Sequence, residues 1–402
     1  MKTELSKKSK KRRFWMMETL KNEVRDLTGQ LIEWRRDFHR HPEIAFHEER
    51  TSKTILTFME TLGMPVSSYA KTGLRAELEG KPGGKTVAIR ADMDALPITE
   101  EGDKEYISEN PGATHACGHD GHMAIAMGTA KILAHRKNQF RGKVVFLFQP
   151  AEELPPGGAK PMLNEGALEG VDAIFGLHLW QSLPTGSIGI VKGPMMAQAD
   201  NFEIVVRGKA GHASMPHQAV DSILAASHII VNSQSIVSRS VNPLKPVVVS
   251  FGTVKGGTVY NIIPPEVKLT GTVRTFDSSV QNLAQKRLKE IAKMTAKTFG
   301  AESEFKYIKG YPPVVNNPDM TDFVLEVVKK VLGEDRIKAF NPVMGGEDFA
   351  YFLQKLPGAF LFFGMGDGME FPHHHPAFDI DERALPEATL LMTNIALEYL
   401  KY

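Results

Sequence analysis

The feature that most constrains the fold of this chain is an alternation of short apolar strands with helix-length segments. Strands are predicted at 74–78, 87–90, 143–148, 173–180 and 359–363. Between several of them, apolar residues recur at helical spacing, and polar or charged residues follow directly on the strand ends. This pattern predicts an α/β layer with a site at the carboxyl edge of its sheet.

The pattern changes from Asn201 onward. The order strand, helix, strand, strand, helix, strand is that of a ferredoxin-like α+β module. Its predicted elements are 202–206, 219–237, 247–251, 267–274, 280–298 and 304–308. We therefore expect residues 199–309 to form an inserted domain, with 17–198 and 310–402 forming the first domain.

The charge balance argues against nucleic acid or a membrane as partner. The 402 residues include 48 basic and 47 acidic side chains, so no global field attracts a polyanion. A single cysteine cannot form an internal disulfide, which fits a reducing compartment and favours the cytoplasm. Residues 1–16 are basic, and their apolar part is too short for a signal peptide. A disordered leader is expected there, with an upstream start codon or an electrostatic membrane anchor as alternatives.

The stretch from Thr114 to His122 has the composition of a metal site. It holds the only cysteine, Cys117, together with three histidines and an aspartate, directly before an apolar run at 123–134. Cys117 and His119, two residues apart on a glycine-containing turn, offer thiolate and imidazole to one cation. The alternative is that Cys117 is an inert buried hydrophobe.

Carboxylates and further histidines follow other predicted strands. Asp92 and Asp94 come after strand 87–90, and Glu152 and Glu153 come after strand 143–148. Adjacent carboxylates repel one another, so each pair either faces water or neighbours a cation. His178 could be a hydrogen-bonded core residue, and 373–375, three consecutive histidines, could be a solvated loop.

Taken together, these residues suit two hydrolytic metal ions with a spare carboxylate that activates water. The inventory is Cys117, His119, Glu153, His178 and one of His373, His374 and His375, with Glu152 and Asp94 left over.

From about Leu20 onward the chain resembles the M20 metallopeptidase family, in its aminoacylase-type branch of N-acyl-amino-acid, hippurate and auxin-conjugate hydrolases. The resemblance implies a zinc-peptidase-like catalytic domain with an inserted ferredoxin-like lid and dimerisation domain. The matching motifs are Asp92–Pro97, His115–His122, Gln149–Glu153, Gly176–His178, Gly211–His212, Asn261–Pro264 and His374–Pro376.

The resemblance also implies roles for individual residues. Glu152 would be the general base, Asp94 would orient a ligand, and His212 would reach the partner's active site in a dimer to hold the substrate oxyanion. Asn261 and Arg274 would bind the substrate carboxylate. The two divalent metal ions, which could be manganese, zinc, nickel or cobalt, would be held by Cys117, His119, Glu153, His178 and His374.

The expected activity is hydrolysis of a small N-acyl-L-amino acid to a carboxylate and a free amino acid. A homodimer or dimer-based oligomer through the lid is implied as well. One alternative is a dipeptidase or N-acetyldiaminopimelate deacetylase with the same metal site. An alternative of another class is a non-catalytic protein that binds amino-acid conjugates.

Overall fold

A seven-stranded sheet organises the first of two units into which the chain divides. The computed structural model describes residues 2–368 and 370–401. The first unit comprises the chain up to Gly193, Val315–Asn341 and the chain from Asp348 onward. The second unit comprises Pro194–Val314 and Pro342–Glu347. The predicted boundaries at 198/199 and 309/310 fall inside strands of the second unit, because those strands extend beyond their most apolar residues.

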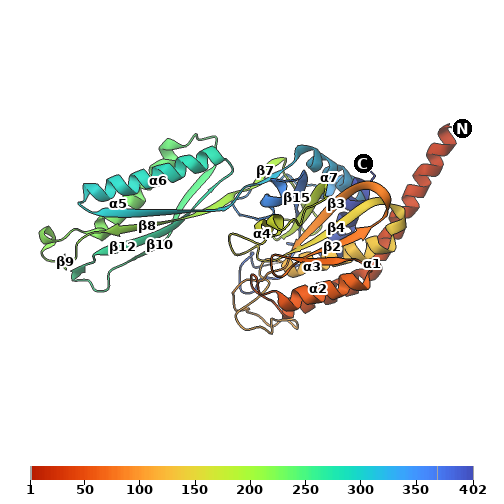
Figure 1. The fold of residues 1–402 in the computed structure, drawn as a ribbon, viewed down its shortest axis with the longest axis horizontal. Coiled ribbons are helices and arrows are strands. Elements are labelled where there is room, and N and C mark those ends of the chain that lie inside the picture. The colour runs from red at the N-terminus through yellow and green to blue at the C-terminus, as the bar shows by residue number, and fades with distance from the viewer. Residues whose placement is uncertain (1, 369, 402) are drawn as a thin grey trace. The chain divides into compact units, whose positions relative to one another are not determined.

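The first sheet has the strand order β1-β2-β4-β3-β5-β15-β6 (Figure 1). Strands β4, β3, β5 and β15 are parallel to their neighbours in this series, so their carboxyl ends share one edge. The predicted α/β class is confirmed. The strands are β1 (Val66–Tyr69), β2 (Gly73–Glu79), β3 (Lys81–Asp92), β4 (Arg141–Gln149), β5 (Ala173–Trp180), β6 (Ile188–Gly189) and β15 (Gly358–Gly364).

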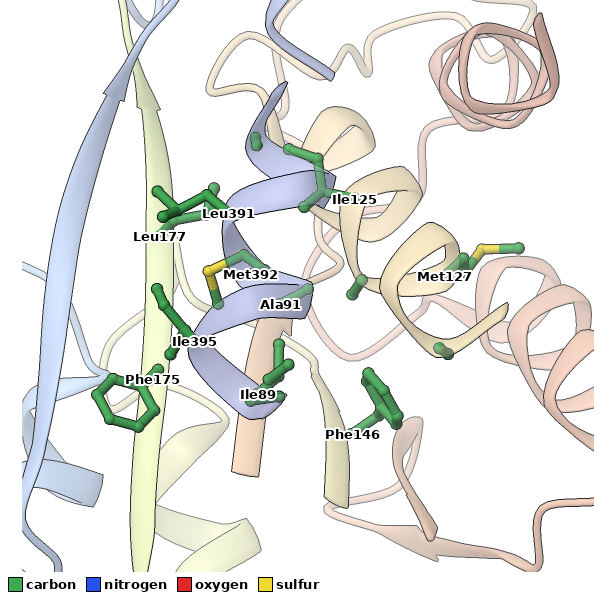
Figure 2. Packing of buried hydrophobic residues seen from close by; sticks show 14 of the residues in the cluster. Ile89, Ala91, Ile125, Met127, Phe146, Phe175, Leu177, Leu391, Met392 and Ile395 are labelled. Atoms are coloured by element: carbon green, nitrogen blue, oxygen red, sulfur yellow. The ribbon is translucent and has the colours of Figure 1, made fainter. Parts of the chain in front are cut away.

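Three helices of the first unit, α1, α3 and α9, contact one another, and α3 and α9 also pack on β3. Figure 2 shows Ile395 of α9 and Ile89 of β3 in the resulting core, where the rings of Phe175 and Tyr399 lie 5.8 Å apart. Each such buried side chain contributes about 1.5–3 kcal/mol. The helices are α1 (Lys2–Arg40), α2 (Glu49–Thr61), α3 (His119–His135), α4 (Ala159–Asn164), α7 (Pro318–Val331), α8 (Ala350–Leu353) and α9 (Ala384–Tyr399).

Helix α1 begins well before residue 17, the expected start of the first domain. Residues 2–16, for which the sequence predicts a disordered leader, form the start of α1 instead. Lysine, arginine, leucine and glutamate favour helix, and no glycine or proline occurs before Gly29. Among residues 2–368 and 370–401, no helix is both long enough and apolar enough to cross a bilayer.

The second unit is an antiparallel sheet of order β10-β12-β8-β13, with α5 and α6 packed together on one face (Figure 1). This order confirms the ferredoxin-like prediction. Asp221 caps α5 by accepting a hydrogen bond from the Leu224 amide at 2.9 Å, which is why the helix begins at Ser222. The elements are β8 (Gln198–Arg207), α5 (Ser222–Ser235), β10 (Val247–Gly256), β12 (Glu266–Thr275), α6 (Ser278–Thr298) and β13 (Glu302–Tyr311).

Two short sheets complete the topology. Strand β9 (Gly211–His212) pairs antiparallel with β11 (Ile262–Ile263). Strand β7 (Gly193–Met196) pairs with β14 (Val314–Asn316), where the chain enters and leaves the second unit.

Candidate metal centre

The candidate site lies at the carboxyl edge of the first sheet. Strand β3 ends at Asp92 and leads to Asp94, and β4 ends at Gln149 and leads to Glu152 and Glu153. His178 lies near the end of β5. This is the edge at which open α/β sheets bind ligands.

Helix α3 brings two histidines to this edge. It begins at His119 rather than at Met123, the start expected from the apolar run. Gly118, at the N-cap, has a φ of 86°, a left-handed conformation that glycine adopts readily. The turn therefore places His119 and His122 three residues apart in the first turn of the helix, where their ring centroids are 5.4 Å apart.

The five predicted ligands converge. Cys117 Sγ lies 3.4 Å from His178 Nε2, and Glu153 Oε1 lies 3.2 Å from His374 Nε2. Three sets of ligand atoms lie within 4.8 Å of one another: Cys117, His119 and His178; Cys117, Glu153 and His374; and His119, Glu152 and Glu153. Because the sets share members, they form one continuous cluster that includes Glu152.

The hydrogen bonds of the histidines fit metal coordination. Nδ1 of His119 bonds to the backbone carbonyl of Asp94 at 2.8 Å, and Nδ1 of His178 bonds to that of Leu179 at 2.8 Å. When the rings are neutral, each Nδ1 donates to its carbonyl and each Nε2 carries the lone pair, the arrangement usual for metal-bound histidine. Within the described chain, His119 Nε2 is buried without a hydrogen-bond partner. A buried nitrogen left unpaired in this way is costly, and a cation would satisfy it.

Of the three consecutive histidines, only His374 belongs to these ligand sets. Its φ is 67°, and its backbone amide donates to the Ala116 carbonyl at 2.8 Å, which ties this loop to the Cys117 stretch. His373 Nε2 bonds to the Leu179 carbonyl at 3.0 Å, and the His375 ring stacks on Phe371 with centroids 4.5 Å apart.

The electrostatics of the cluster favour a cation. Burial and the neighbouring Glu153 raise the pKa of the Cys117 thiol well above its usual value. Burial lowers the pKa of His119, but the carboxylates of Asp92 and Asp94 outweigh that effect and raise this pKa to about 10. Several carboxylates thus share a buried site, and divalent ions would relieve their repulsion.

Asp94 contacts the site in two ways. Its carbonyl holds His119, as described above, and its carboxylate accepts the amides of Glu152 and Glu153, each at 2.9 Å. The side chain thus fixes the backbone that carries the acidic pair.

Asp92 and His122 form a buried pair at this site, and neither residue was assigned a role from the sequence. Asp92 Oδ1 lies 2.6 Å from His122 Nδ1, and Asp92 Oδ2 accepts from Arg90 at 2.7 Å. The other ring nitrogen of His122 accepts from the Leu179 amide at 2.9 Å. A usable signal was the spacing of Asp92 and Asp94, because residues two apart in extended chain point to the same side.

Three further predicted residues belong to the second unit. His212 is exposed on β9, and its Nδ1 lies 2.9 Å from the Ser214 hydroxyl. The backbone carbonyl of Asn261 accepts from the Ala213 amide at 3.0 Å, so Asn261 lies in the same β9–β11 region. Arg274 is on β12, where its Nε donates to the Thr272 hydroxyl at 3.0 Å and burial lowers its pKa.

The α/β fold and the cluster of thiol, imidazole and carboxylate ligands define a metal-dependent hydrolase with a binuclear centre. The chain belongs to peptidase family M20/M25/M40, whose family model matches residues 88–398.

Three proteins illustrate the similarity. An N-acyl-L-amino acid amidohydrolase of Geobacillus stearothermophilus is 46% identical over 74% of this chain and 81% of its own length. Thermostable carboxypeptidase 1 of Saccharolobus solfataricus is 38% identical over 96% of this chain and 99% of its own. The crystal structure of a dinuclear metal binding peptidase of the M20 family from Bacillus subtilis is 37% identical, with a TM-score of 0.82 over 94% of this chain and 99% of that chain.

Proposed function

We propose that this protein hydrolyses the amide bond of N-acyl-L-amino acids and releases a carboxylate and a free amino acid. The observation that carries the proposal is the cluster of metal-ligand atoms around Glu152. Glu152 lies beside His119 and Glu153, which in turn share ligand sets with Cys117, His178 and His374. The similarity to the Geobacillus amidohydrolase supports the choice of substrate.

Cys117, His119, Glu153, His178 and His374 would hold the ions. Two divalent ions there would supply Lewis acidity toward the amide carbonyl and lower the pKa of nearby water. Glu152 is the acidic residue left for proton transfer, and its backbone amide is fixed by Asp94 at 2.9 Å. Its carboxylate would accept the proton of the attacking water and later deliver it to the leaving amine.

Replacing Glu152 by glutamine tests this role. Glutamine keeps the size of the side chain but cannot accept and return a proton. Turnover of N-acetyl amino acids should fall by about 10²–10⁴-fold, with metal content unchanged. Full activity in the Glu152→Gln protein would refute the mechanism.

Peptide hydrolysis is a second candidate, because the similar Saccharolobus protein is named a carboxypeptidase. The same metal ligands and the same base could cleave the amide of an N-acyl amino acid or of a peptide. The pocket that binds the acyl group therefore determines which of the two is the substrate. A panel of N-acetyl, N-benzoyl and indoleacetyl amino acids and dipeptides separates the two. If no amino acid is released with manganese, zinc, nickel or cobalt supplied, the chain is instead a binding protein for such conjugates.

We further propose a dimer formed through the second unit. Ile223, Leu224 and Val231 of α5 and the nearby Tyr260 segment expose large apolar side chains, Tyr260 being 98% exposed. Apolar patches of this kind are typical of protein interfaces. In the dimer, His212 would enter the partner's site to stabilise the oxyanion, while Asn261 and Arg274 bind the substrate carboxylate. A fully active monomer in sedimentation velocity would exclude this role for His212. The single cysteine supports a cytoplasmic location.

A further inference from the structure

Glu48 is an acidic residue whose side chain is wholly buried, although it lies at the entry to helix α2. Its exposed fraction is 0%. As the N-cap residue it could cap α2, yet its side chain makes no capping hydrogen bond. Glu43 does so instead, accepting from the amides of Arg50 at 3.0 Å and Thr51 at 2.8 Å. The Glu48 carboxylate is therefore available for another contact.

That contact is with the backbone next to the candidate base. Glu48 Oε1 accepts from the Ala151 amide at 2.9 Å, and Oε2 accepts from the Thr72 hydroxyl at 2.6 Å. Ala151 is buried and has a φ of 54°, a left-handed conformation that alanine disfavours. The hydrogen bond from Glu48 helps to hold this residue in that conformation.

Three successive amides are thus held by two buried carboxylates. The amide of Ala151 donates to Glu48, and those of Glu152 and Glu153 donate to the two oxygens of Asp94. The two carboxylates come from different parts of the chain, one preceding α2 and the other following β3. The turn that carries Glu152 is therefore fixed at each of its first residues.

The environment of Glu48 argues against a role as half of an ion pair. The two oxygens of its carboxylate accept from a hydroxyl and a backbone amide, both of which are uncharged. Burying an acid without a cation is unfavourable. The energetic cost of burying Glu48 points to a role other than an ion pair. Its hydrogen bonds with Thr72 and Ala151 indicate that this role is to hold the backbone at Ala151.

We propose that Glu48 is a positioning residue for the reaction, acting through the Ala151 amide to aim the carboxylate of Glu152. The inference rests on the function proposed above for Glu152. Loss of the Glu48 contact would let Ala151 relax toward an ordinary conformation and move Glu152 away from the reacting atoms. Glu152 follows Ala151 directly, whereas Glu153 lies one residue further along and keeps its hydrogen bond to Asp94, so the ions should stay.

Three substitutions in the full chain test the inference, measured with metal supplied and N-acetyl amino acids as substrate. Glu48→Ala removes the acceptor, and Glu48→Asp keeps the acid but shortens it by one methylene. Both should lower kcat by about 10²-fold, the scale expected for a misplacement of about 1 Å, with KM and metal stoichiometry unchanged. Glu48→Gln keeps an oxygen that can accept from Ala151, so it should retain most of the activity.

Glu165 provides a matched control. Its carboxylate accepts from the amide of Ala70 at 2.6 Å, and Ala70 also has a positive φ, 45°. Glu165→Ala should leave kcat unchanged. If Glu48→Ala does not fold, Glu48→Asp carries the test.

The outcomes separate the two proposals. If the wild-type protein releases no amino acid from any substrate, the proposed function fails. If the wild-type protein is active and Glu48→Asp matches its kcat, the positioning role is wrong. Loss of metal in Glu48→Asp, or equal loss of kcat in Glu48→Gln and Glu48→Asp, would also overturn it, because the contact with Ala151 would then not be what matters.

Discussion

Glutamine at position 48 should make the protein more stable above neutral pH while leaving its stability in acid unchanged. Burial raises the pKa of Glu48 from 4.5 to about 7, and the neighbouring Asp94 adds to the shift. The hydrogen bonds from Thr72 and Ala151 lower the pKa but do not offset burial. The folded protein therefore binds this proton more tightly than the unfolded chain does.

The sign and size of this stability difference follow from the linkage between proton binding and folding. Stability from the protonated side chain is fully present below pH 4.5 and is lost as the pH rises to about 7. Each unit of pKa difference corresponds to about 1.4 kcal/mol, so ionisation of Glu48 destabilises the wild-type protein by about 3 kcal/mol at pH 8. Solvent screening does not reduce this figure, because the side chain is fully buried. Glutamine cannot ionise, so Glu48→Gln should be more stable by about that amount at pH 8.

Urea unfolding followed by tryptophan fluorescence measures the effect, since all three tryptophans belong to the first unit. Both proteins should be treated with chelator first, so that metal binding does not contribute to the pH dependence. The difference in unfolding free energy should grow between pH 4.5 and about 7 and then level off. A difference that is absent at pH 8, or equally large at pH 4.5, would refute the reasoning.

Two further substitutions probe the ligands and their support. Arg35→Leu should lower the unfolding free energy by about 3–5 kcal/mol. The buried Arg35 donates to Asp120 at 2.8 Å and to Asp379 at 2.6 Å, so its loss removes the guanidinium that faces two carboxylates. Urea unfolding at pH 7.5 checks this, and a loss under 1 kcal/mol would contradict it. His374→Ala should reduce the bound metal per chain, whereas the control His373→Ala should not, because His374 faces Glu153 and His373 bonds to the Leu179 carbonyl. Elemental analysis after gel filtration measures the metal content of both proteins. Equal metal content would argue against His374 as a ligand.

The fold was predictable where apolar periodicity is strong. Five strands of the first sheet and all four of the second were found from their apolar residues, but β1 and β6 were missed, and most of the strand ends differ. Strand β3 begins at Lys81, an exposed residue that pairs with Arg141 ahead of a register shift before Thr86, and a side-chain pattern cannot reveal such pairing. The start of α3 was missed for a similar reason, because it depends on the left-handed conformation of Gly118.

The candidate site divides in the same way. Cys117, His119 and the acidic pair were visible because each follows a strand or turn within a short motif. The choice among the three histidines needed the family resemblance, and in the structure it is backbone conformation that separates His374 from its neighbours. Glu48 gave no sequence signal, because its partner Ala151 lies 103 residues further along the chain.

The position of β15 in the first sheet has a consequence for biosynthesis. This strand lies between β5 and β6, yet the ribosome makes it only after the whole segment 194–314 has been synthesised. The second unit's ferredoxin-like sheet is encoded continuously and can form during translation, while the first sheet still presents β5 as an open edge. His374 is made later still, so the candidate metal centre can be completed only after that residue has been synthesised.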